Sequence, residues 1–217
     1  MDQIQEFRKM IASYGAEIYD RHLTDASGGN ISARVGDKIV MTPTRAGSTW
    51  HWRLRPEQIL ILDLKGNKLE GEGEISREAK VHLALLNEFY PEGTAVVHSH
   101  ARNVLVFCAA EKPMPSVLYA TSFLGVVEQC KDAVSGSDDL AVFVADKIRE
   151  KGGVKKARAA ACMAPRHGLF VLAKSLYDAF DVTERIDTNA YCLLMGKTLG
   201  EMTPMGAESK AHQEYEK

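Results

Sequence analysis

The sequence predicts a single α/β domain built around a mixed β-sheet. Segments with helical periodicity alternate with short β-like runs along the whole chain. Several of these runs are separated by gaps of hairpin length, which favours a mixed over a purely parallel sheet, because parallel strands need long crossovers. No internal repeat, low-complexity linker or run of like charge divides the chain, so residues 1–217 are expected to form one domain.

The first half of the chain is expected to contain two helices and three strands. Apolar residues at helical spacing predict a helix over residues 3–22, which the glycines of DASGGN end. Residues 30–33 and 38–41 predict two strands joined by a turn at Gly36 and Asp37. ILILDL (59–64) predicts a third strand, and Ser76 is expected to cap a helix that runs towards Phe89.

The second half repeats this alternation. Residues 94–98 predict a strand, and a helix is expected to begin near Ala101. Residues 137–150 predict a helix that Gly152 and Gly153 end. Residues 159–164 and 169–172 are expected to pair as a hairpin with residues 165–168 at its tip, before a long final helix over 175–195.

The composition is typical of a globular protein, with 45% hydrophobic and 26% charged residues. The formal net charge of -2 gives no electrostatic reason to expect a nucleic acid or an anionic membrane as partner. No apolar run approaches the roughly 18 to 20 residues needed to cross a bilayer, and the charged start is unlike a signal peptide. The widely spread cysteines (Cys108, Cys130, Cys162 and Cys192) predict reduced thiols in a cytoplasmic protein.

The strongest chemical signal is a histidine pair in VVHSHA (96–101). Alternate side chains of a strand share a face, so His98 and His100 are expected to project together. His167, in PRHG, lies at the predicted hairpin turn, from which its imidazole could enter a cleft. Three histidines with one open position are the usual layout of a catalytic zinc site, whereas the alternative is three solvated or hydrogen-bonded histidines without a metal.

Two further segments could contribute to such a site. Glu78 falls in the first turn of the helix expected after Ser76, where the helix dipole favours a carboxylate with or without a catalytic role. His82 could share that face, but the leucines around it indicate that it flanks the core. SGGNIS (27–32) places backbone N–H groups, a hydroxyl and an amide at the start of a strand, which can hold a phosphate, although most Gly-Gly turns are only turns.

Together these segments resemble the class II aldolase/adducin family. The similarity spans about 150 residues in the family's order, and the first and last helices extend it over nearly the whole chain. An H-x-H pair with a downstream HG and an upstream acidic helix start is fairly specific as a set. The matching segments are SGGNIS (27–32), MTPT (41–44), ISREAKVH (75–82), VVHSHA (96–101), MPSVLY (114–119) and HGLFVLA (167–173).

The resemblance implies a three-layer α/β/α domain with a central mixed, largely antiparallel sheet, assembled as a homotetramer with active sites between subunits. It implies that His98, His100 and His167 hold Zn²⁺, or another divalent metal such as Mn²⁺ or Co²⁺. Glu78 would touch the resting metal and then act as general base, and Tyr119 would reach a neighbouring subunit's site to handle a proton. The positions that match the phosphate cradle are Ser27, Gly28, Asn30, Thr44 and Ser76.

The implied activity is that of an aldolase-type lyase in carbohydrate metabolism, which cleaves a sugar phosphate or related hydroxy-ketone through a metal-bound enediolate. A sugar-phosphate 4-epimerase, a decarboxylase of a keto or hydroxyaromatic acid and a sugar-phosphate dehydratase can use the same kind of site. A non-catalytic adducin-like scaffold is expected to lose the metal ligands, and a structural zinc site needs a fourth ligand, for which this chain offers only Glu78.

Arg45 and Arg77 depart from the family pattern, in which small residues are expected beside the phosphate-binding positions. A guanidinium group pairs bidentately with a carboxylate or a phosphate. The two arginines therefore indicate an anionic group larger than the usual phosphate, or a carboxylate; the alternative is that they face solvent. Trp50 and Trp52 lie in a loop that is longer than in sugar-phosphate aldolases, which predicts a subunit interface or a pocket wall.

Overall fold

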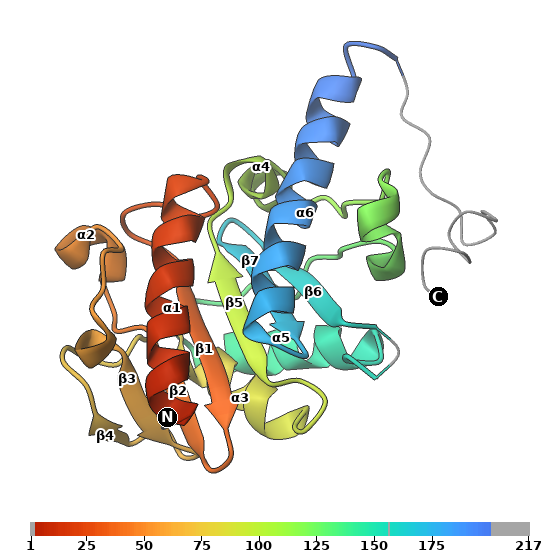
Figure 1. Cartoon of the computed structure of the whole chain (residues 1–217). Helices are drawn as coiled ribbons and strands as arrows, with labels where there is room; N and C mark the ends of the chain where they lie inside the picture. Colours follow the sequence, from red (N-terminus) through yellow and green to blue (C-terminus); the bar gives the residue numbers. More distant parts are fainter. Residues whose placement is uncertain (1–2, 156, 201–217) are drawn as a thin grey trace.

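The computed structural model describes residues 3–155 and 157–200 of the chain. Its centre is a seven-stranded sheet with the order β4-β3-β2-β1-β5-β7-β6 (Figure 1). Its strands are β1 (Asn30–Val35), β2 (Lys38–Met41), β3 (Leu60–Asp63), β4 (Lys68–Glu70), β5 (Ala95–Ser99), β6 (Ala159–Ala164) and β7 (Gly168–Ala173). Residues 201–217 of the single domain expected from the sequence lie outside the described residues.

The α-helices and two short 3₁₀ helices connect these strands. They are α1 (Gln3–Asp20), α2 (Ala46–Trp50), η1 (Pro56–Gln58), α3 (Ala79–Glu88), α4 (Arg102–Ala110), η2 (Tyr119–Leu124), α5 (Asp138–Glu150) and α6 (Leu176–Gly196). The hydroxyls of Ser137 and Ser175 accept hydrogen bonds from the backbone of Leu140 and Asp178, which caps α5 and α6 at the predicted positions.

Within the described residues, all neighbouring strands of the sheet pair antiparallel. In the part of the chain that the structure describes, the one parallel pairing is an isolated bridge between Gln129 and Met163. The sheet is therefore more uniformly antiparallel than predicted, because β5 also runs antiparallel to both β1 and β7 although long segments separate it from them in the chain. The predicted hairpin turn at Gly36, with φ +60°, is confirmed between β1 and β2.

Alternate strand residues supply separate hydrophobic cores on the two faces of the sheet. Val97 and Val171 point to the face where α1, α4 and α6 pack, whereas Val96 and Leu172 point to the face of α3 and α5. Figure 1 shows α1 and α6 side by side in front of the sheet, and these two helices are in contact. The two packed faces leave the ends of the strands to carry the polar residues described below.

Helix α3 begins later than predicted, at Ala79, and Glu78 occupies its N-cap position without capping the helix through its side chain. The Ser76 hydroxyl accepts a hydrogen bond from the backbone N–H of Glu78, 3.2 Å away, so Ser76 organises the turn before the helix. The Glu78 carboxylate is therefore free to point away from the helix, and it enters the candidate site.

Trp52 is a core residue and not part of an interface or a pocket wall, which corrects the expectation for this position. Its side chain is fully buried, and its indole N–H donates to the backbone oxygen of Asp25, 3.0 Å away. This contact joins the segment of residues 45–52 to the glycine-rich turn. Trp50 is half-buried and lines a hollow near the candidate site.

Replacing Trp52 with alanine is expected to lower the free energy of unfolding by about 3–5 kcal/mol, because it removes a large buried ring and a buried hydrogen bond. Trp52→Phe keeps much of the ring and should cost clearly less. Urea unfolding followed by circular dichroism measures both variants. A loss below about 1 kcal/mol for the alanine variant would contradict the assigned core role.

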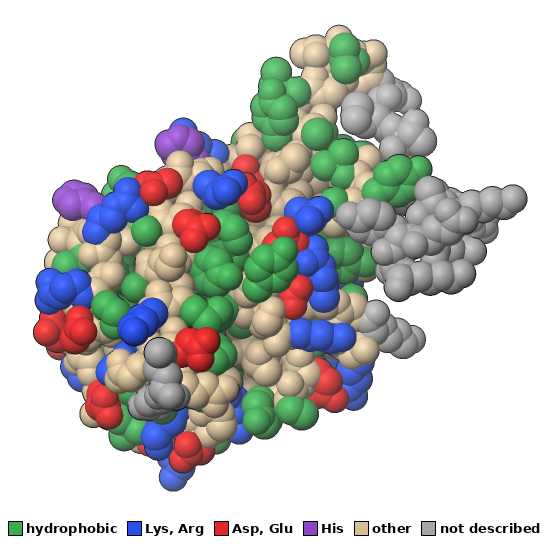
Figure 2. Space-filling model, in the orientation of Figure 1, with side chains coloured by type: hydrophobic (Ala, Val, Ile, Leu, Met, Phe, Trp, Pro, Cys, Tyr) green, Lys and Arg blue, Asp and Glu red, His purple; other side chains and the backbone are tan. Residues whose placement is uncertain are grey.

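The surface shows charges of both signs interspersed over the face that carries α1 and α6 (Figure 2). The end of α6 projects beyond the rest of the described chain (Figure 1), and its Tyr191 and Met195 are each about half exposed. In residues 3–155 and 157–200, no helix is long and apolar enough to cross a membrane. The cysteines are free thiols, as predicted, and Cys192 is the least buried of them.

Candidate metal and substrate site

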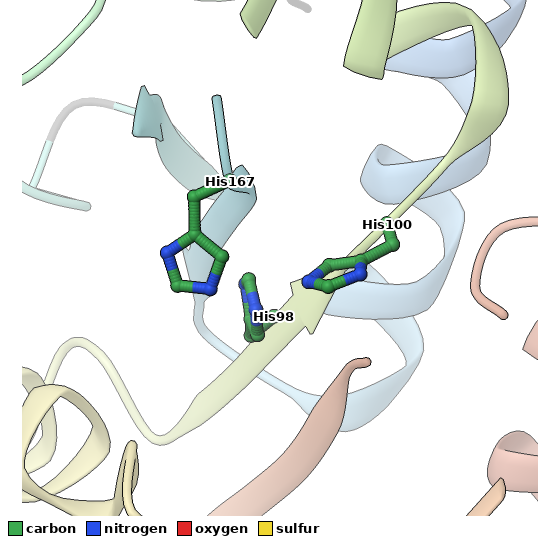
Figure 3. A group of neighbouring side chains, drawn as sticks. All are labelled: His98, His100 and His167. Atoms are coloured by element: carbon green, nitrogen blue, oxygen red, sulfur yellow. The ribbon is translucent and has the colours of Figure 1, made fainter. Parts of the chain in front are cut away.

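The predicted histidines meet at one end of the sheet. Strand register places Asn30, the first residue of β1, opposite His98 of β5, and His98 opposite Phe170 of β7. His100 follows the end of β5, and His167 lies in the turn between β6 and β7. Three segments that are distant in the sequence therefore supply one cluster of side chains (Figure 3).

One ring nitrogen from each of His98, His100 and His167 lies within 4.8 Å of the others. In Figure 3 the three rings gather round a common space. The His98 ring stacks on Phe170 with a centroid distance of 4.2 Å, and its Nδ1 lies 3.0 Å from the backbone oxygen of Leu169. Because that oxygen can only accept, Nδ1 carries the proton and Nε2 offers its lone pair to the cluster.

These residues fit a divalent metal ion. His98 Nε2 and His100 Nε2 are buried and have no hydrogen-bond partner among the described residues, and His167 turns its Nε2 towards His98 (Figure 3). Buried polar atoms are nearly always paired, so two unpaired nitrogens beside a third imidazole suit a divalent cation. Burial and the neighbouring His98 lower the pKa of His100 to about 4, which keeps its imidazole neutral and able to bind a metal at neutral pH.

The Glu78 carboxylate lies between two of these imidazoles. Its oxygens are 3.0 Å from His98 Nε2 and 2.7 Å from His167 Nε2. Burial lowers the pKa of His98, but the Glu78 carboxylate raises it more, so this contact favours a proton on His98 Nε2, which a bound metal would replace. Burial raises the pKa of the Glu78 carboxyl, but His98 and His167 lower it more, and the net pKa lies far below the ordinary range.

A buried hydrogen-bond chain holds Glu78 from behind. Both amide donors of Asn30 are occupied: one donates to Glu78 and the other to Ser76, each at 3.2 Å. The Asn30 oxygen accepts from His82 Nε2, so His82 Nδ1 accepts from the hydroxyl of Ser32, 2.6 Å away. In this arrangement both donors of the Asn30 side chain are directed to Ser76 and Glu78, and this contact fixes the position of the Glu78 carboxylate.

His82 is neutral and structural in this chain. Full burial and the nearby His98 lower the pKa of His82 to about 3. It is not part of the group of three histidines found in the described residues. The leucine-rich surroundings that indicated a residue beside the core therefore predicted its position correctly.

A hollow of about 240 Å³, here called the inner hollow, opens above this cluster. His98 lies beneath its floor and is fully buried. All five predicted phosphate-binding positions and both arginines line it. Its lining comprises Ser27, Gly28, Gly29, Asn30, Thr44, Arg45, Ser76, Arg77, Glu78, Ser135, His100 and His167.

Tyr119 is not brought to the inner hollow of its own chain. It begins η2, and 48% of its surface is exposed. Any contact that it makes with a substrate must therefore involve another copy of the chain or a movement.

Asp25 and Ser135 are site residues that the sequence reasoning missed. One Asp25 oxygen lies 3.2 Å from His100 Nδ1, and the other accepts the backbone N–H groups of Ser27 and Gly28, both at 2.7 Å. Ser135 donates to Glu78 at 2.8 Å from a loop 57 residues further along the chain. The sequence carries no signal for either contact, because DAS is typical of a turn and Ser135 precedes an ordinary helix cap.

The contact with Asp25 changes how the glycine-rich turn can bind an anion. The N–H groups of Ser27 and Gly28 already donate to a carboxylate and are not available to a phosphate. The polar groups of the inner hollow that remain for an anion include the hydroxyls of Ser27, Thr44 and Ser76. The guanidinium groups at its edge then become the main source of positive charge.

Comparison with known proteins places this geometry in a family. Residues 9–194 match the model of the class II aldolase and adducin N-terminal domain. The chain is 27% identical to 5-deoxy-D-ribulose 1-phosphate aldolase of Bacillus thuringiensis serovar kurstaki, over 91% of this chain and 89% of that protein. It is 28% identical to 3-oxo-tetronate 4-phosphate decarboxylase of Haemophilus influenzae, over 90% and 91% respectively.

The fold is also similar to a solved structure. An L-fuculose 1-phosphate aldolase superposes with a TM-score of 0.83, covering 99% of this chain and 96% of that one at 23% identity. This likeness shows a shared α/β architecture, as the sequence resemblance implied.

Proposed function

Because the chain belongs to the class II aldolase and adducin family, we propose that it is a metal-dependent lyase of the aldolase type, which cleaves a sugar phosphate or related hydroxy-ketone. The observation that carries the proposal is the position of Glu78, whose carboxylate lies within 3.0 Å of two of three converging histidines. Relatives that are sugar-phosphate aldolases support the substrate class.

In this proposal His98, His100 and His167 hold the metal, which is Zn²⁺ or another divalent ion such as Mn²⁺ or Co²⁺. When bound, the metal would supply Lewis acidity that stabilises negative charge on the substrate oxygens. Glu78 would take or return the proton at the reacting carbon. Asn30 and Ser135 hold the Glu78 carboxylate by hydrogen bonds and so set the direction from which it acts.

The substrate would bind to the residues of the inner hollow other than the histidines and Glu78. Ser27, Thr44 and Ser76 would bind the phosphate through their hydroxyls, and Gly28 leaves room beside His100. Arg45 and Arg77 would add the positive charge. These groups orient the substrate without taking part in bond making.

We further propose that the protein assembles as a homotetramer in the cytoplasm and that Tyr119 acts in a neighbouring subunit's site. The exposed position of Tyr119 and the projecting end of α6 with Tyr191 and Met195 support an assembly. Helices on both faces of the sheet support the three-layer α/β/α arrangement, with residues 1–217 as one domain.

A decarboxylase is the second candidate, because one similar relative acts on 3-oxo-tetronate 4-phosphate. Loss of CO₂ beside a carbonyl develops the same negative charge as cleavage of a carbon–carbon bond to an aldehyde, so the same histidines would serve. The epimerase and dehydratase alternatives also share this requirement. The product separates them: an aldehyde, CO₂, an inverted alcohol or a dehydrated sugar.

The test uses the metal-loaded chain with dihydroxyacetone phosphate in deuterated water. An aldolase of this type removes a proton from this donor, so metal-dependent incorporation of deuterium is expected, and added L-lactaldehyde should be consumed. Parallel incubation with keto-acid phosphates detects CO₂. CO₂ release without exchange would favour the decarboxylase, and metal binding without either reaction would contradict both.

Replacing Asp25 with asparagine is expected to weaken metal binding about 10- to 100-fold, because a carboxylate that orients a ligating histidine contributes that much in known metal sites. The asparagine oxygen can still accept the N–H groups of Ser27 and Gly28, so the turn should persist. Competition with a metallochromic indicator measures the dissociation constant. Asp20→Asn, which removes an exposed partner of Arg53, is the control, and equal affinities in all three proteins would argue against the role of Asp25.

A further inference from the structure

A second hollow, here called the outer hollow, adjoins the inner hollow on the side away from the histidines. It has a volume of about 750 Å³, against about 240 Å³ for the inner hollow. Ser27, Thr44, Arg45 and Arg77 line both, whereas no histidine lines the outer one. The two hollows are therefore neighbours, and both arginines belong to the wall that they share.

Neither arginine at this junction is neutralised by the described part of the chain. Within residues 3–155 and 157–200, no hydrogen bond or ion pair joins the guanidinium group of Arg45 or Arg77 to another group. By contrast, Arg53, Arg149 and Arg166 each contact a carboxylate. Glu74, which also lines the outer hollow, forms no ion pair with either junction arginine. The junction thus presents unpaired positive charge beside an open space.

The backbone at both arginines is held in place. Arg45 has a left-handed conformation with φ 59°, which a residue other than glycine adopts only where the surroundings enforce it. Trp52, at the end of the same segment, is fully buried and donates its indole N–H to the backbone oxygen of Asp25. Beside Arg77, a Cβ added to Gly136 would lie 2.9 Å from the Arg77 Cβ, so this loop packs directly against it.

The inner hollow has few strong donors of its own for an anion. The N–H groups of Ser27 and Gly28 are bonded to Asp25, and both amide donors of Asn30 are occupied. Hydroxyls can hold one phosphate, but the two free guanidinium forks match a further carboxylate or phosphate bidentately.

We propose that the outer hollow is a second substrate subsite, and that the substrate is a hydroxy-ketone carrying two anionic groups on the same end. The first binds to the hydroxyls of Ser27, Thr44 and Ser76, and the second binds to Arg45 and Arg77 at the entrance to the outer hollow. This inference rests on the proposed function only in that the reacting end faces His98, His100 and His167. The second anionic group is a carboxylate or a phosphate.

The test compares two probes on the metal-loaded chain by isothermal titration calorimetry: 3-phosphonopropionate and propylphosphonate, which lacks the carboxylate. The wild type is expected to bind the doubly anionic probe about 10-fold more tightly or better, the effect of one charge-assisted pair. In Arg45→Gly, Arg77→Ser this ratio should fall to about 1. Glycine fits the left-handed backbone at residue 45, so the double variant should fold.

Two results would overturn the proposal. A ratio near 1 in the wild type means that no second anion is bound, and a ratio that persists in the double variant means that the carboxylate binds elsewhere, for example to the metal. Lys65→Ser is the matched charge control, because Lys65 follows β3 at the end of the sheet opposite the site, and its ratio should equal that of the wild type. Deuterium exchange into dihydroxyacetone phosphate reports separately on the proposed function.

Discussion

The double variant His98→Ala, His100→Ala is expected to purify without the metal that the wild type binds at near one equivalent per chain. Two of three converging donors are then missing, and one imidazole with a carboxylate does not complete a tetrahedral site. Because the proposed chemistry needs a Lewis acid, exchange of deuterium into dihydroxyacetone phosphate should fall to background. Elemental analysis of the purified chains measures the first effect and proton NMR the second.

A second variant is needed, because loss of the buried His98 ring affects stability as well as metal binding. His98 is fully buried against Phe170, so its truncation leaves a cavity and lowers stability as well as metal binding. His100→Ala alone keeps that stacking and should still lose most of the metal. His22→Asn, at an exposed histidine with left-handed backbone that asparagine tolerates, is the control. Metal that remains at one equivalent in the double variant would exclude these histidines as its ligands.

The variant Glu78→Gln is expected to keep the metal and lose the reaction. Glutamine preserves the size of the side chain; its oxygen can accept from Asn30 and its NH₂ group can donate to the Ser135 hydroxyl, but it cannot take a proton from carbon. General acid–base groups contribute about 10²- to 10⁴-fold, so kcat and the exchange rate should fall by that factor. If deuterium exchange stops while the chain still binds one equivalent of metal, the loss is due to the missing base and not to loss of the metal site.

Glu74→Gln is the matched control for this variant, because Glu74 lines only the outer hollow and contacts none of the histidines among the described residues. It should exchange deuterium at the rate of the wild type. If Glu78→Gln also exchanges at that rate, the base is another group, and the contact of Glu78 with His98 and His167 is structural.

The local elements were predictable from the sequence because each has a local cause. The glycines at 36, 152 and 153 mark turns, and Ser137 and Ser175 cap the helices that follow them. The sequence does not predict β4, a strand of three exposed residues with no buried face, or α2, whose N-cap Arg45 has a left-handed backbone conformation. In both cases the partner segment, and not the local pattern, determines the structure.

Some residues of the candidate site could likewise be predicted from the sequence, and others could not. His98, His100, His167 and Glu78 are recognisable because metal chemistry restricts residue type and order along the chain. The groups that hold them are not recognisable, since an aspartate before a glycine-rich turn and a serine before a helix are typical of loops. Asp25 reaches His100 over 75 residues and Ser135 reaches Glu78 over 57, distances that only the folded chain reveals.

Trp52 restricts how this family could be re-engineered or could diverge. A Cβ added at Gly15 would lie 3.1 Å from the indole ring, and one added at Gly47 would lie 2.7 Å from its nitrogen. The ring thus requires the glycine at position 47, and a side chain at position 15 would crowd it. Residues 45–52 could be transplanted into another family member to transfer a preference for anionic substrates. The recipient must then also have a small residue at position 15. In related sequences, substitutions at position 15 and in residues 45–52 should therefore occur together.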